Sequence, residues 1–328
     1  MRNAYTFGIA LLLSIGAASA QDTVTNSYTQ INLVSDGSVS GTMTDTHLVN
    51  PWGLSRTSNS YWWASDDATG VSTLYDEHGN AQSLVVTIPP ASGTGTGSPT
   101  GTVANGGGFV FVTLDGTVQA WTGGTKAVIK ATKSGAFYTG VTLATDAGVK
   151  TLYAANSGGS VDAYNASTYA PITLASGSFV YPNLPAGFTP YGIQAIGSKI
   201  YVTYASAAGA GKGFVGIFSP AGKLLGKLAH GTYMNEPWGI ALAPSNFGAF
   251  SGDILVGMTG SGQIAAFTST GTFAGVLKDS TGKPIANPGL WAIYFGSGGL
   301  TGPTNWLYFT AGIDNFAHGL FGYFISND

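Results

Sequence analysis

The chain has 328 residues, of which only 8% are charged, and its formal net charge is −3. It contains no cysteine, which excludes disulfides, thiol nucleophiles and thiolate metal sites. The few basic residues form no stripe that could offset phosphate charge, which excludes nucleic acid as a partner. The 50 glycines and the 12% of aromatic residues are typical of short strands joined by tight turns.

The N-terminus has the pattern of a secretory signal peptide. Arg2 provides a positive start, residues 7–15 form an apolar core, and residues 18–20 are a small-residue cleavage signal. The apolar stretch is too short to span a bilayer. We therefore expect residues 1–20 to be removed and residues 21–328 to form a single domain. That domain would be secreted or reside in the secretory-pathway lumen, with no membrane association.

Strand-like alternation of apolar and polar residues then repeats along the chain, and helical periodicity is nearly absent. The first predicted strand, residues 28–34, precedes the repeats. Six strand pairs follow, predicted within residues 61–75, 109–121, 151–164, 199–218, 254–267 and 306–324. Each pair comes after a start signal with Pro-Gly or an aromatic residue, at 51–54, 99–101, 138–141, 190–193, 237–240 and 289–293.

The start signals are 39 to 52 residues apart, which is the size of a four-stranded propeller blade. We therefore predict an all-β fold, a six-bladed β-propeller with four-stranded blades. Proline is tolerated at the first residue of a strand, and glycine lets crowded inner strands approach closely. Residues 28–34 are expected to pair with the last blade and close the ring, which removes two free strand edges.

The repeats at 152–164 and 237–267 resemble NHL-type blades, and the Gly-His and Trp-Asp signature of WD40 blades is missing. Asn50-Pro-Trp-Gly-Leu, Ser65-Asp66-Asp67 and His318-Gly-Leu-Phe-Gly are similar to a family of secreted six-bladed propellers from bacteria and fungi, most without an assigned function. The group includes intermolecular hetero-Diels–Alderases of fungal tropolone–sesquiterpenoid (meroterpenoid) biosynthesis. The chain looks like these enzymes in architecture, signal peptide and low charge. The resemblance implies a metal-independent cycloaddition of small apolar molecules, with no cofactor.

Blade geometry predicts which side chains share one face. The loop that enters the inner strand and the loop that leaves the second strand lie on the same face, where the channel opens. The residues expected there are polar but mostly uncharged and include three tryptophans, a lining that suits an apolar ligand oriented by a few hydrogen bonds. Packing between blades is the alternative interpretation of the tryptophans. The candidate substrate-binding residues are Asn50, Trp52, Asn156, Gln194, Trp238, Trp291 and Thr310.

A cycloaddition needs no covalent nucleophile, because holding the reactants as near-attack conformers already lowers the barrier. A weak general acid would help if the diene is a quinone methide formed by loss of water. The candidates for this catalytic role are His318, Asp66 and Tyr204. The alternatives are a structural histidine at His318 and an aspartate that bonds backbone N–H groups at Asp66.

Two other functions stay open at this stage. One is a non-catalytic secreted binding scaffold, since fold alone does not fix function. The other is a calcium-dependent lactonase-like hydrolase, in which Asp66, Asp67, Asp115 and Asn156 would supply oxygen ligands. The early-blade glutamate expected of such hydrolases is absent. No Gly-x-Ser-x-Gly elbow occurs, and the four histidines are too scattered for zinc.

Residues Asn165-Ala166-Ser167 form an N-glycosylation sequon at a turn after a predicted strand. In a eukaryotic host we expect Asn165 to carry a glycan, because a turn leaves room for one.

Overall fold

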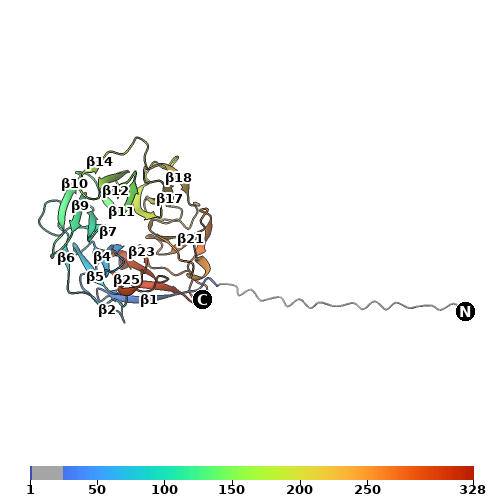
Figure 1. Cartoon of the computed structure of the whole chain (residues 1–328). Coiled ribbons are helices and arrows are strands. Elements are labelled where there is room, and N and C mark those ends of the chain that lie inside the picture. The colour runs from blue at the N-terminus through green and yellow to red at the C-terminus, as the bar shows by residue number, and fades with distance from the viewer. Residues whose placement is uncertain (2–24) are drawn as a thin grey trace.

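The computed structural model describes residue 1 and residues 25–328, which form six sheets arranged in a ring (Figure 1). The fold is an all-β six-bladed propeller with four-stranded blades, as predicted. The predicted signal peptide lies, apart from Met1, outside the described residues. Within the described residues no helix is long and apolar enough to cross a membrane.

Five blades each consist of four consecutive antiparallel strands, with the first strand innermost. Their strands are β3 (Pro51–Ser55), β4 (Trp62–Asp66), β5 (Val71–Tyr75) and β6 (Val86–Thr87); β7 (Pro99–Asn105), β8 (Gly108–Thr113), β9 (Thr117–Trp121) and β10 (Val128–Thr132); β11 (Tyr138–Asp146), β12 (Val149–Asn156), β13 (Ser160–Asn165) and β14 (Pro171–Ile172); β15 (Thr189–Ile196), β16 (Lys199–Ala205), β17 (Gly213–Phe218) and β18 (Leu224–Lys227); and β19 (Pro237–Leu242), β20 (Ile254–Met258), β21 (Ile264–Phe267) and β22 (Phe273–Val276). We number these blades 1 to 5 in chain order.

Blade 6 is built from both ends of the described chain. It contains β23 (Leu290–Phe295), β24 (Leu307–Ala311) and β25 (Leu320–Ser326), and β1 (Tyr28–Ser35) pairs antiparallel with β25. The short β2 (Met43–Thr44) lies parallel outside β1. The predicted closure by the N-terminal strand is therefore confirmed, and Figure 1 shows β1 beside β25. Three short helical segments are η1 (Gly248–Phe250), η2 (Gly299–Thr301) and α1 (Ile313–Phe316).

The inner strands β3, β7, β11, β15, β19 and β23 surround the channel, each against the next. All six have a register shift near their first residue, for example between Pro51 and Leu54 in β3. The start-signal glycines allow this close packing: a Cβ on Gly53 would lie 2.5 Å from the carbonyl oxygen of Thr100 in β7. Gly239 faces the backbone of Trp291 in the same way. The predicted role of these glycines is thus confirmed.

Candidate functional site

We call the face at which the inner strands begin the proximal face, and the opposite one the distal face. The antiparallel register pairs the first residue of an inner strand with the last residue of the second strand. Pro51 lies opposite Asp66, and Pro237 lies opposite Met258. The expectation that these two loops of each blade share a face is therefore correct.

Three tryptophans and a tyrosine fill the proximal end of the channel. Trp52 and Trp291 stack with ring centroids 3.6 Å apart, and Trp238 meets both edge-on at 6.3 and 5.8 Å. Tyr191 lies 6.3 Å from Trp52 and 5.9 Å from Trp291. The three tryptophans are at most 9% exposed. They pack across the channel axis and form an aromatic floor, which we call the tryptophan cluster.

Hydrogen bonds fix two of the three indoles. The Trp291 Nε1–H donates to Asn50 Oδ1 at 2.9 Å, and the Trp238 Nε1–H donates to the Thr139 carbonyl at 2.9 Å. The Trp52 Nε1–H is buried and has no hydrogen-bond partner among the described residues. Thr310, fully buried, donates its hydroxyl to the Trp52 carbonyl and accepts from the Ala292 N–H. Thr310 therefore links the backbone of Trp52 to the backbone of Ala292 beneath the cluster.

Phe316 extends this aromatic surface to solvent. It ends α1, which connects β24 to β25, and its ring lies 5.5 Å from that of Trp291. Phe316 is 43% exposed. Asp314, Asn315 and Phe316 all have positive φ, between 55° and 68°, a conformation that costs free energy for residues other than glycine. The fold thus holds an exposed aromatic ring over the tryptophan cluster in a strained loop.

Asp67 is a titratable group at the edge of the cluster. Its Oδ2 accepts a 3.0 Å hydrogen bond from Asn50 Nδ2, so that Trp291, Asn50 and Asp67 form a chain. Its Oδ1 is buried without a partner among the described residues. Burial raises the pKa of Asp67 to about 6, although the bond from Asn50 acts in the opposite direction. A carboxyl group of this kind is partly protonated near neutral pH, as a general acid must be.

Its neighbour Asp66, which the sequence favoured for this role, points into blade 1. It is fully buried, and its Oδ2 accepts from both the N–H and the hydroxyl of Thr73. Burial raises its pKa well above the usual range. Asp66 is the last residue of β4, whereas Asp67 begins the turn that follows and accepts from Asn50 at the edge of the cluster. The alternative interpretation of Asp66, an aspartate that bonds nearby backbone, fits its surroundings. From the sequence, Asp67 was considered only as a calcium ligand and was not assigned the role of a general acid.

Glu236 is a second carboxyl group on the proximal face. It precedes Pro237 with a φ of 55°, and burial raises its pKa. Burial, followed by the charge of Glu236, also raises the pKa of Tyr191. The carboxyl groups of Glu236 and Asp67 thus come from the loop that enters β19 and the turn that leaves β4, both on the proximal face.

The side chains of the other two predicted catalytic residues have partners outside the cluster. His318 pairs with Asp36 at 2.7 Å beside the outer strand β1, and this hydrogen bond raises the pKa of His318. Tyr204 is 3% exposed inside blade 4, donates to the Phe179 carbonyl and has a pKa that burial raises. Their catalytic roles stay predictions, but the structure does not bring the two side chains together.

Two of the predicted substrate-binding residues, Asn156 and Gln194, do not line the tryptophan cluster. Asn156 is 5% exposed; its Oδ1 accepts from the N–H groups of Phe137 and Gly158, and its amide donates to Asp162. Gln194 lies near the end of β15 and therefore on the distal side of the channel. Asn50, Trp52, Trp238 and Trp291 do lie together, and Thr310 is buried beneath them.

Three of the four oxygen ligands considered for calcium, namely Asp66, Asp115 and Asn156, are engaged in separate parts of the fold, whereas Asp67 bonds Asn50 and keeps one oxygen without a partner among the described residues. Asp115 bonds the Thr113 hydroxyl and the Ala91 N–H, while Asp66 and Asn156 make the bonds described above. Across the described residues, no group of three or more His, Cys, Asp or Glu side chains could hold a metal ion. The donor set expected for a lactonase-like centre does not assemble here.

The predicted glycosylation site, Asn165, ends β13 at the turn that the sequence indicated. Its Oδ1 accepts from the N–H groups of Ser167 and Thr168.

Comparison with known proteins supports the fold and leaves the function unassigned. No family model matches the sequence. Uncharacterized protein R648 of Acanthamoeba polyphaga mimivirus is 28% identical over 322 residues, covering 88% of this chain and 78% of that protein. Uncharacterized protein R640 of the same virus is 31% identical over 203 residues, 56% of this chain and 37% of that protein. A streptogramin B lyase structure matches with a TM-score of 0.57 and 13% identity, covering 92% of this chain and 97% of the lyase. This likeness concerns the fold alone.

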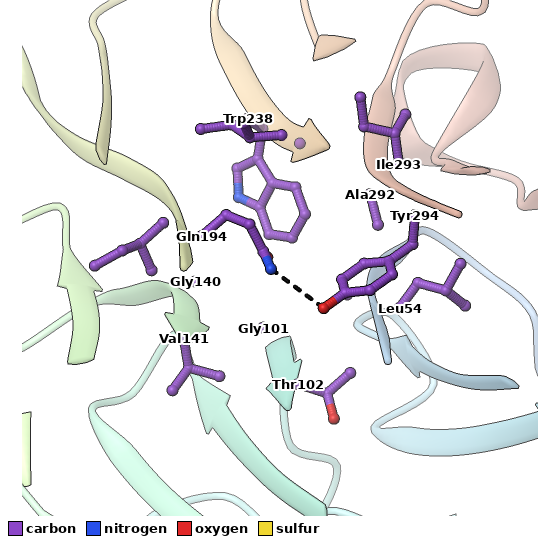
Figure 2. A pocket seen from close by; sticks show the side chains of 14 residues that line it. Leu54, Gly101, Thr102, Gly140, Val141, Gln194, Trp238, Ala292, Ile293 and Tyr294 are labelled. Carbon is purple, nitrogen blue, oxygen red and sulfur yellow. Dashed lines mark hydrogen bonds between the residues drawn. The ribbon is translucent and has the colours of Figure 1, made fainter. Parts of the chain in front are cut away.

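Below the tryptophan cluster the channel narrows to a tunnel with a volume of about 30 Å³, room for roughly two water molecules. Figure 2 shows Gln194 reaching across the tunnel toward Tyr294, whose hydroxyl accepts from Gln194 Nε2 at 3.2 Å. Leu54, Val141 and Ile293 supply apolar parts of the wall. A larger ligand therefore has no passage from one face to the other.

A separate aromatic groove of about 530 Å³ lies between blades 1 and 2, toward the distal face. Trp63 stacks on Phe109 at 4.1 Å and meets Trp121 at 4.5 Å, and Tyr61 also lines the groove. Trp63 and Phe109 are 46 residues apart, about one blade repeat. We did not predict this groove; the blade period was the signal that could have brought the two rings together.

Proposed function

We propose that the protein is an exported enzyme that binds uncharged, largely apolar reactants over the tryptophan cluster and catalyses an acid-assisted hetero-Diels–Alder cycloaddition. The observation that carries this proposal is the Asp67 carboxyl, with its pKa of about 6, held by Asn50 beside the aromatic floor. The resemblance to secreted propellers of tropolone–sesquiterpenoid biosynthesis supplies the reaction class.

In this proposal Asp67 catalyses the loss of water that makes the diene. Protonated Asp67 gives its proton to the leaving hydroxyl of a tropolonic alcohol, the C–O bond breaks, and water departs. The proton of the adjacent ring hydroxyl returns to the Asp67 carboxylate, so that the enzyme is regenerated and the product is a quinone methide. With a pKa of about 6, roughly a tenth of Asp67 is protonated at pH 7.

The second step needs no proton or electron from the protein. The quinone methide supplies C=C–C=O and the alkene supplies C=C, and one C–C and one C–O bond form as these π bonds rearrange. The protein contributes by holding both reactants in one relative orientation. Trp52, Trp291 and the exposed ring of Phe316 offer flat apolar surfaces for this purpose, and no fixed charge is required at the reacting atoms.

The experiment incubates the mature protein, with a chelator present, with a tropolonic alcohol and a humulene-type alkene. Chromatography would compare yield and stereochemistry with a buffer control. We expect the wild type to give one stereoisomer in excess and Asp67→Asn to lose rate. The matched control, Asp146→Asn, changes a carboxylate at the distal end of β11 and should behave as the wild type. Identical yield and stereochemistry in wild type and buffer would refute the proposal.

A non-catalytic binding function is the second candidate, and the aromatic groove between blades 1 and 2 favours it. Its volume of about 530 Å³ lies within the roughly 300–1,000 Å³ of drug-sized sites. Quenching of tryptophan fluorescence by uncharged aromatic compounds would detect binding there. Trp121→Ala should abolish the response, whereas Trp306→Ala, which removes a partly exposed tryptophan of blade 6, should not. Equal responses from both variants would argue against this groove.

A further inference from the structure

The distal end of the channel opens into a cleft that the proposed function does not use. The ends of β15, β19 and β23 surround it together with Arg56, and its volume is about 220 Å³. Gln194, Ile240 and Tyr294 line both this cleft and the narrow tunnel, so the two are continuous. Figure 2 shows Gln194 and Tyr294 in the tunnel wall. The tunnel is too narrow to join the cleft to the tryptophan cluster, and the cleft is therefore a separate site.

Arg56 provides the only charge among the residues that line this cleft. The chain has one other arginine, Arg2, in the predicted signal peptide. Arg56 Nε and Nη2 donate to the Phe295 carbonyl at 3.0 and 2.7 Å, and Nη2 also donates to the Gly296 carbonyl at 3.2 Å. The guanidinium lies over the rings of Trp62 and Tyr294, at 5.4 and 5.6 Å. These contacts fix one edge of the guanidinium in place.

The other edge of the guanidinium is available to a ligand. Within residues 25–328, Arg56 forms no ion pair with a carboxylate, and its Nη1 donates to no protein acceptor. A partly buried charge without a counter-charge is costly, because carbonyl dipoles replace only part of the lost hydration. Burial accordingly lowers the pKa of Arg56. An anion that accepted from Nη1 would relieve this cost.

Tyr294 offers a second donor beside Arg56. Its hydroxyl oxygen accepts from Gln194 Nε2 at 3.2 Å, which leaves the hydroxyl hydrogen free to donate. Apart from Gln194, the other side chains that line the cleft are apolar and include Ile196, Ile240 and Leu242. The cleft thus combines one positive charge, two kinds of hydrogen-bond donor and an apolar wall.

We propose that this cleft binds a small monocarboxylate with an apolar tail. The carboxylate would accept from Arg56 Nη1 and from the Tyr294 hydroxyl, and the tail would lie against Ile240 and Leu242. One guanidinium balances one negative charge, and its planar edge matches a carboxylate. A phosphate dianion would keep an uncompensated charge here. A volume of about 220 Å³, below the roughly 300–1,000 Å³ typical of drug-sized ligands, limits the ligand to a small molecule.

The test measures binding of benzoate to the mature protein by titration calorimetry, with benzamide as an uncharged probe of the same shape. We expect benzoate to bind at least about tenfold more tightly than benzamide, the ratio expected for hydrogen bonds to a charged group. Arg56→Gln should remove the preference, and Tyr294→Phe, which deletes one hydroxyl, should weaken benzoate severalfold. The matched control Lys199→Gln removes a positive charge at the start of β16 on the same face, outside the cleft, and should leave binding unchanged.

Each result decides the proposal. Equal affinity for benzoate and benzamide, or no benzoate binding up to about 10 mM, would overturn it. So would unchanged benzoate binding by a folded Arg56→Gln variant. If Arg56→Gln does not fold, Tyr294→Phe decides, because loss of one hydroxyl leaves the ring and its packing in place. Unchanged benzoate affinity in that variant overturns the proposal, and a severalfold loss supports it.

Discussion

Replacing Asp67 by asparagine should stabilise the protein at neutral pH, and the gain should disappear in acid. The pKa of Asp67 is about 6 in the folded protein, against an ordinary value of 3.8. Above pH 6 the carboxyl is ionised in both states, and the folded state bears the cost of burying the charge. The difference of about 2.2 pKa units corresponds to about 3 kcal/mol, an upper bound because Asp67 keeps some contact with solvent.

The dependence on pH follows from the direction of this shift. Between pH 6 and 4 the folded state binds a proton that the unfolded state has lost, so the wild type gains stability as the pH falls. Below about pH 4 both states are protonated and the cost is gone. Asparagine has the same shape, cannot ionise, and still accepts from Asn50 through its carbonyl oxygen. The stability difference between variant and wild type should therefore shrink from about 3 kcal/mol at pH 7 toward zero at pH 4.

Urea unfolding followed by fluorescence at several pH values measures this difference. Asp66 and Glu236 also have raised pKa values and shape the pH dependence of the wild type, but they are present in both proteins and largely cancel in the comparison. Asp146→Asn serves as the control and should follow the wild type at every pH. A stability difference between Asp67→Asn and wild type that is the same at pH 4 and pH 7 would show that the Asp67 carboxyl is not desolvated in the folded protein.

Two further predictions concern the fold and the N-terminus. Gly53→Ala should lower stability by about 1–3 kcal/mol or more, measured by urea unfolding, because its Cβ would meet the backbone of β7; Gly107→Ala, where a Cβ has open space, should have little effect. Stability equal to that of Gly107→Ala would contradict the crowding argument. The full chain, expressed with its own N-terminus, should be exported and begin at Gln21, which N-terminal sequencing of the exported protein checks; an intact Met1 would contradict the signal-peptide assignment.

The blade period made the fold predictable, because a start signal recurring every 39 to 52 residues admits few other architectures. The position of each side chain within its blade was harder to predict from the sequence. Gln194 lies five residues after Thr189, the first residue of β15, and at about 3.3 Å per residue it is roughly 17 Å from the proximal face. Tyr204 does lie near the end of its strand, but its hydroxyl reaches Phe179 inside the blade. The direction in which a side chain points, and its distance from the proximal face, depend on β-bulges and on packing between blades. The repeat pattern of the sequence does not encode either feature.

The direction of the pKa shifts separates two kinds of ionisable group in this weakly charged chain. Asp36 and His318 form a pair: hydrogen bonds outweigh burial at Asp36 and lower its pKa, and the bond to Asp36 raises the pKa of His318. Both shifts favour the charged forms, as a structural ion pair requires. At Asp67, Glu236 and Arg56 burial dominates, and every shift favours the neutral form.

At Asp67, Glu236 and Arg56 burial therefore disfavours the ionised form of the side chain. Asp66 has the same sign of shift, but it is sealed inside blade 1, out of reach of a ligand. The other three lie at the two ends of one channel, where a bound molecule can supply the missing partner. A destabilising charge is retained most readily where it does something that a neutral residue cannot. The buried charges at Asp67, Glu236 and Arg56 therefore favour a binding role at both ends of the channel, whatever chemistry takes place there.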